Sequence, residues 1–112
     1  MESILTSIKK LLGITEEYTH FDADIIMHIN SVFMVLNQLG VGPAKCFRIT
    51  GDAEIWDDFL LDKLDLESVK SYIHLKVKLL FDPPLSSSVM EATNRLIGEF
   101  EWRLRLAAES SE

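Results

Sequence analysis

The acidic residues between positions 52 and 67 are the first candidates for chemistry, because carboxylate oxygens are the ligands that hard cations prefer. A calcium-binding EF-hand loop needs its oxygen ligands at fixed alternate positions, a central glycine and a closing glutamate. Here Trp56 and Phe59 interrupt the acidic run, and no glycine stands at the turn. We therefore interpret the run as helix caps and a solvated acidic face, and predict no metal. Its members are Asp52, Glu54, Asp57, Asp58, Asp62, Asp65 and Glu67.

The histidines, the single cysteine and the glycine pair also lack the spacing of a catalytic or cofactor site. His20, His28 and His74 are scattered, with no HExxH pattern and no cysteine at the spacing of zinc ligands. A nucleophilic Cys46 would need a positioned base, which its neighbours in the sequence do not supply. The stretch at 40–43 lacks the third glycine and the lysine of phosphate-binding loops. We expect no catalytic residue and no cofactor, and we do not expect an enzyme.

The charge balance argues against a general DNA-binding surface. Of the 112 residues, 18 are acidic and 11 are basic, which gives a net charge of −7 at pH 7. Duplex DNA is held largely by Lys and Arg side chains, whereas an acidic surface lets nucleic acid pass without sticking. Arg95, Arg103 and Arg105 are a candidate basic patch, but Glu99 and Glu101 alternate with them. Ion pairs between these arginines and glutamates of the same helix explain the pattern more simply.

The composition is that of one soluble, intracellular domain. A chain of 112 residues, 47% of them hydrophobic, can bury a single core. A lone Cys46 forms no intrachain disulfide, so a reducing compartment is expected. The N-terminal residues lack the features of a secretion signal, and no stretch approaches the ~20 apolar residues of a membrane span. We expect one domain over 1–112, with a frayed tail at 109–112.

Apolar residues at helical spacing predict an all-α bundle of about five helices. The predicted helix starts are capped by Asp52, by Asp65 and by a capping box formed by Ser88 and Glu91. Glycine or proline follows the other predicted ends, where the chain can leave the helical conformation. The predicted helices cover about Glu2 to Leu12, Asp22 to Leu39, Ala53 to Leu61, Leu66 to Phe81 and Ser88 to Ala108.

The second and fourth helices carry more apolar surface than a one-sided core requires. Either the second helix is the central, fully buried helix of the bundle, or part of its surface faces a partner. On the fourth helix, Tyr72, Leu75 and Leu79 form a second stripe beside the core stripe. Exposed apolar stripes usually mark partner surfaces, and head-to-tail contacts in a ring would bury them. These three residues are therefore candidate interface residues.

Residues 40–52 break the helical pattern. Phe47, Arg48, Ile49 and Thr50 alternate apolar and polar, which is typical of a short extended segment. A lone strand is not stable without a partner, so it needs a short hairpin or a strand from another chain. We predict that 40–52 is the most mobile internal segment of an isolated subunit.

Four local strings carry a resemblance to a known family. They are Phe21-Asp22-x-Asp24-Ile25-Ile26-x-His28-Ile29-Asn30, Leu39-Gly40-Val41-Gly42-Pro43, Tyr72-Ile73-x-Leu75-Lys76-Val77-Lys78-Leu79-Leu80-Phe81-Asp82-Pro83-Pro84 and Glu99-Phe100-Glu101-Trp102-Arg103-Leu104. Together they resemble the small head–tail connector proteins, also called adaptor or head-completion proteins, of tailed bacteriophages and bacterial prophages. The resemblance runs from the first helix to Leu104, and its motifs mark structural elements and their ends, not catalytic sites.

The resemblance implies a helical subunit that forms a homo-oligomeric ring beneath the portal after DNA packaging. Such a ring extends the DNA channel, lets DNA pass without sequence-specific binding, and receives the next connector or tail protein. It implies the bacterial cytoplasm during assembly, then the head–tail junction of the virion, and no membrane. The segment around 40–52 resembles the family's long loop, so Phe47, Arg48 and Ile49 are further candidate interface residues that would add an edge to a partner's backbone. The family has no catalytic residues to transfer.

Two other functions stay open from the residues alone. The chain is also consistent with a helical adaptor or regulator that binds one cellular protein through the fourth helix. A third hypothesis is a DNA-binding module that uses the C-terminal helix. Self-association and portal binding separate the connector from the adaptor. Salt-dependent DNA binding that is lost in an Arg103→Glu, Arg105→Glu variant would favour the third hypothesis.

Overall fold

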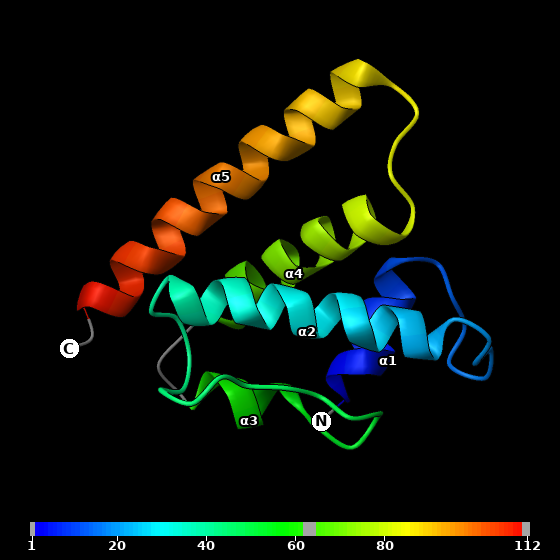
Figure 1. Ribbon diagram of the computed structural model, residues 1–112, viewed down its shortest axis with the longest axis horizontal. Helices are drawn as coiled ribbons and strands as arrows, with labels where there is room; N and C mark the ends of the chain where they lie inside the picture. Colours follow the sequence, from blue (N-terminus) through cyan, green and yellow to red (C-terminus); the bar gives the residue numbers. More distant parts are fainter. Residues whose placement is uncertain (1, 62–64, 111–112) are drawn as a thin grey trace.

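Helices form most of the computed structural model, which describes residues 2–61 and 65–110 (Figure 1). The predicted all-α fold is confirmed: the described ranges contain five helices and no strand, only an isolated antiparallel bridge between Ser3 and Ile55. The helices are α1 (Ile4–Leu11), α2 (Asp22–Gln38), α3 (Trp56–Leu60), α4 (Leu66–Phe81) and α5 (Ser87–Ser110).

The α4 helix holds the bundle together, because it contacts α1, α2 and α5. The segment before α3 runs along one side of α2, and α5 crosses diagonally on the other side (Figure 1). The inner faces of α2 and α4 supply much of the core, including Ile25, Ile29, Val32 and Leu36 from α2 and Val69, Ile73 and Val77 from α4.

The α2 helix is not buried on all sides, so that interpretation of its surplus apolar surface is wrong. Met27 and Met34 on its outer face are 58% and 57% exposed. The two methionines lie off the seam that packs on α4, as the spacing of the core residues requires. The apolar surplus of α2 is therefore available at the surface.

Two predicted helix starts differ from the structure. α3 begins at Trp56 rather than near Ala53, because the Asp58 carboxylate accepts a hydrogen bond from the Ile55 N–H at 3.0 Å and fixes the first turn there. Asp52 is therefore not its cap. α5 begins at Ser87, and the Ser86 hydroxyl accepts a hydrogen bond from the Val89 N–H at 3.4 Å.

The predicted capping box starting at Ser88 is wrong, since Ser88 already lies inside the first turn of α5. The predicted cap of α4 is confirmed: an Asp65 carboxylate oxygen accepts a hydrogen bond from the Ser68 N–H at 3.3 Å. The α5 helix continues through Glu109 and Ser110, and positions 111–112 lie outside the described residues, so fraying of the tail at 109–112 stays a prediction.

Candidate functional site

The six candidate interface residues do not share one surface. The side chains of Ile49 and Tyr72 are 1% and 0% exposed, so both belong to the core of the chain itself. Phe47, Leu75 and Leu79 are half-buried and pack against that core. Among the six, Arg48 alone is exposed.

The second stripe of α4 packs within the chain, which corrects the premise that it is exposed. Tyr72 donates a hydrogen bond from its hydroxyl to the Glu101 carboxylate of α5 at 2.7 Å. Burial and that carboxylate raise the pKa of the Tyr72 phenol well above its ordinary value. Lys76 lies 3.9 Å from the same carboxylate. Tyr72 is thus covered within the chain, and Leu75 and Leu79 are half-buried against its core.

Asn30 on α2 holds the irregular segment in place. Its side-chain carbonyl accepts a hydrogen bond from the Ile49 N–H at 2.8 Å, and its amide donates to the Ile49 carbonyl at 3.0 Å. This pair of bonds is what a neighbouring strand would supply, so one side chain replaces the missing strand. Both backbone groups of Ile49 are occupied, which does not support the prediction that Ile49 adds an edge to a partner's backbone.

An aromatic cluster anchors the same segment beside Ile49. The ring centroid of Phe47 lies 5.0 Å from that of Phe33 on α2 and 5.5 Å from that of Phe59 on α3. Both contacts are edge-to-face, the arrangement that aromatic pairs favour. Because Phe47 and Ile49 point into the chain, the alternation of the sequence turns Arg48 outwards.

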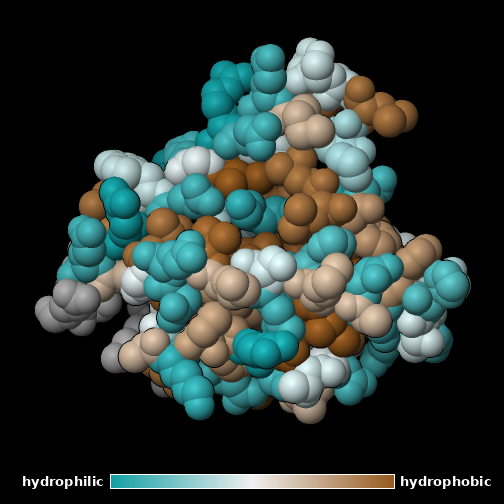
Figure 2. Space-filling model, in the orientation of Figure 1, coloured by the Kyte–Doolittle hydropathy of each residue, from teal (hydrophilic) through white to brown (hydrophobic). Residues whose placement is uncertain are grey.

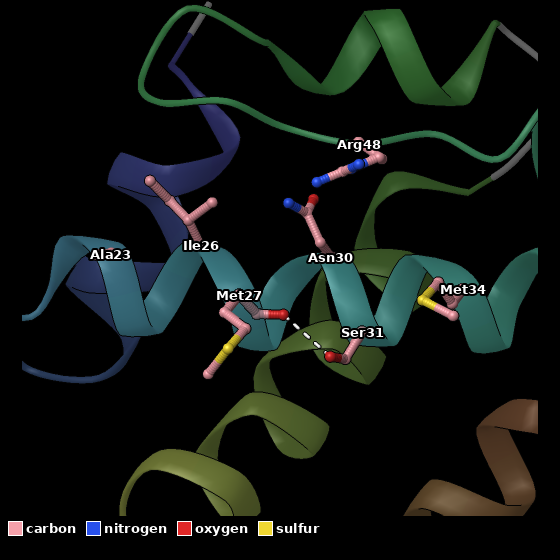
Figure 3. A pocket seen from close by; sticks show the side chains of 7 residues that line it. All are labelled: Ala23, Ile26, Met27, Asn30, Ser31, Met34 and Arg48. Atoms are coloured by element: carbon pink, nitrogen blue, oxygen red, sulfur yellow. Dashed lines mark hydrogen bonds between the residues drawn. The ribbon is translucent and has the colours of Figure 1, made fainter.

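Arg48 lies over a groove of about 440 Å³ on the outer face of α2. Figure 3 shows its guanidinium beside the Asn30 side chain, with Met27 and Met34 along the helix. Met27 and Met34 were not among the residues predicted for the interface. The sequence indicated them only by their position on α2, away from the line of residues that packs in the core. The groove is lined by Ala23, Ile26, Met27, Asn30, Ser31, Met34 and Arg48.

A second apolar surface lies on α5. Figure 2 shows apolar side chains gathered between α5 and α2. On α5 only Ile97 and Leu104 are buried among the residues whose side chains are described. Exposed patches of this kind mark partner surfaces more often than scattered single residues do. The exposed large apolar residues at and before α5 are Leu85, Val89, Leu96, Trp102 and Leu106.

The charged groups form ion pairs that explain much of the sequence pattern. Arg103 pairs with Glu99 at 2.5 Å within α5, as the spacing predicts, whereas Glu101 turns to α4. The side chain of Lys9 is 3% exposed and lies 2.8 Å from the Asp22 carboxylate, which balances its buried charge.

No metal or membrane site emerges from these ranges. Among residues 2–61 and 65–110, no three His, Cys, Asp or Glu side chains are grouped so as to hold a metal ion. Asp62 of the acidic run lies outside the described residues. In the same ranges, no helix has the length and apolar character to cross a membrane.

Comparison with known families shows which family the chain belongs to. The model of the phage connector protein family matches residues 4–111, which is nearly the whole chain. The chain belongs to the phage connector protein family. Searches of curated proteins and of solved structures gave no match. A phage connector protein interacts with other phage head or tail proteins.

Proposed function

We propose that this phage connector protein is the subunit of a homo-oligomeric ring that docks under the portal, extends the DNA channel and receives the next connector or tail protein. The family match supports a role at the head–tail connection. The observation that carries the ring is the pair of unlike apolar surfaces, one on α2 and one on α5. A subunit with two different apolar surfaces can join head to tail, and such contacts close into a ring when the rotation between neighbouring subunits allows it.

The net charge of −7 suits a subunit through which DNA passes. Phosphates are repelled by an acidic wall, so DNA would slide along it without being held. Arg103, one of the few cations of α5, is already neutralised by Glu99. We accordingly expect no sequence-specific DNA binding. A gel shift at low salt that disappears steeply as salt rises would contradict the expectation that DNA passes without being held.

Sedimentation of the chain with the portal oligomer of its own phage tests the proposal. We expect several copies of the chain to sediment with each portal, because weak subunit contacts repeated around a ring reinforce one another. Portal alone and chain alone, at the same concentrations, are the controls. A chain that stays monomeric at every concentration and ignores the portal would overturn the proposed function.

A further inference from the structure

The first half of α5 is a helix that its own chain leaves largely uncovered. The buried residues of α5 are Ile97, near the end of this half, and Leu104, beyond it, and none of the residues 87–96 is buried. In Figure 1, α5 diverges from α2 towards its N-terminal end (yellow). Short helical segments gain little stability by themselves and depend on packing one face. A partner that covered this half would therefore stabilise it.

One stripe of this half is apolar and follows the spacing of a helix-packing seam. Val89 and Leu96 are 50% and 46% exposed, Ala92 between them is exposed, and Leu85 just before the helix is fully exposed. Val89, Ala92 and Leu96 are separated by steps of three and four, and Leu85 precedes the helix. This spacing keeps the three helical residues on one side, where they can interlock with a second helix. We call these four residues the α5 seam.

The outer face of α2 has a seam of the same spacing. Ala23, Met27, Asn30 and Met34 are separated by steps of four, three and four, and all four line the groove under Arg48 (Figure 3). Methionine side chains are flexible and polarisable, so they adapt well to an incoming apolar ridge. We call these four residues the α2 seam.

We propose that the α5 seam of one copy packs antiparallel along the α2 seam of the next copy. The two seams share the three-and-four spacing, and the α2 seam lines a groove that can receive a helix. Each copy therefore offers one of each, which gives a head-to-tail contact. The pairing rests on the proposed function, because it specifies how neighbouring subunits of the ring would join.

Charge complementarity fixes the direction of the pairing. Asp24 flanks the α2 seam at its first residue, and Arg95 flanks the α5 seam at its last. Within the described part of the chain, neither side chain makes an ion pair or a hydrogen bond. The antiparallel arrangement brings the two together, and it places Met27 beside Ala92 of the next copy. A parallel arrangement would instead set Asp24 near Leu85, at the uncharged end of the seam.

Cysteine cross-linking between two variant chains tests the pairing directly, in a Cys46→Ala background. A Met27→Cys chain is mixed with an Ala92→Cys chain, and in parallel with a Leu85→Cys chain, under mild oxidation. Leu85 lies seven residues before Ala92 and outside the helix, whereas a disulfide joins Cα atoms only about 4–7 Å apart. We expect the Ala92→Cys mixture to cross-link at least about tenfold more, although Leu85 is the more exposed. Equal yields, or a higher yield with Leu85→Cys, would overturn the pairing.

Charge reversal gives an independent test by sedimentation. Asp24→Arg and Arg95→Asp should each weaken self-association about tenfold, because like charges then face each other. The double variant should regain the affinity of the unmodified chain. The matched control is Glu109→Arg, an exposed residue of the same helix about 20 Å from Arg95, which should leave the affinity unchanged. A double variant no better than the single variants would contradict the antiparallel contact.

The two proposals fail separately. If several copies bind the portal while the Met27→Cys and Ala92→Cys chains cross-link no more than the control mixture, the helix pairing is wrong and the ring remains supported. If the two chains cross-link but no copy binds the portal, the pairing is supported and the docking under the portal is wrong.

Discussion

Replacing Asn30 by alanine tests whether one side chain holds the irregular segment to α2. The change removes two hydrogen bonds to Ile49, of 2.8 and 3.0 Å, and leaves the Ile49 N–H and carbonyl without these partners. Each such bond contributes about 1 kcal/mol, and stranding its partner adds to the loss. Alanine regains about 0.5 kcal/mol through its higher helix propensity. We therefore expect Asn30→Ala to lower the free energy of unfolding by about 2 kcal/mol.

The matched control is Asn37→Ala on the same helix. Asn37 also donates to this segment, but its bonds to the carbonyls of Pro43 and Ala44 are long, at 3.5 and 3.4 Å. The gain in helix propensity is the same at both positions, so it cancels in the comparison. We expect Asn37→Ala to change stability by less than about 0.5 kcal/mol, since bonds of this length contribute little.

Urea denaturation and amide exchange measure the effect. With an m-value of about 2 kcal/mol/M, the midpoint of Asn30→Ala should fall by about 1 M relative to the unmodified chain. The Ile49 amide should exchange slowly in the unmodified chain and at least about tenfold faster in Asn30→Ala. Equal midpoints for the two alanine variants, or an Ile49 amide as fast in both proteins, would refute the role of Asn30 as a strand substitute.

Three further variants test the packing that positions the two apolar surfaces. Gly42→Ala should lower the free energy of unfolding by about 2 kcal/mol or more, because a Cβ there would lie 2.5 Å from an aromatic ring. Gly40→Ala, also at positive φ but in open space, should lower it by about 1 kcal/mol, and urea midpoints compare the two variants. Ser7→Ala strands the buried indole N–H of Trp56, which donates to Ser7 at 3.0 Å, and should lower the melting temperature by about 5 °C or more. The raised pKa of Tyr72 favours the protonated phenol in the folded state, so its contribution to stability is complete below pH ~10 and is lost as the pH rises further. Tyr72→Phe should therefore lose less stability than the unmodified chain in unfolding scans from about pH 8 to 12.

The apolar periodicity of the sequence was sufficient to predict the helices, because burial of one face leaves a direct trace in residue spacing. The fourth helix, from Leu66 to Phe81, was predicted with both ends correct, since Asp65 caps one and a proline pair follows the other. The starts of α3 and α5 were misplaced, because several neighbouring polar residues compete for the cap and local spacing does not choose between them.

The interface was harder to predict from spacing alone. A second apolar stripe on a helix looks the same whether another helix of the same chain or another protein covers it. Tyr72 is covered by α5, whereas Met27 is uncovered, and only the packing of the whole chain separates the two cases. The support of Ile49 by Asn30 was also hidden, because it joins positions 19 residues apart through a side chain that has many other possible roles.

Electron cryomicroscopy of the portal oligomer incubated with this chain tests the central claim most directly. The account predicts a closed ring of helical subunits coaxial with the portal channel, with the first half of α5 of each subunit against α2 of its neighbour. A portal without added density, or with isolated copies bound away from the channel axis, would contradict the account.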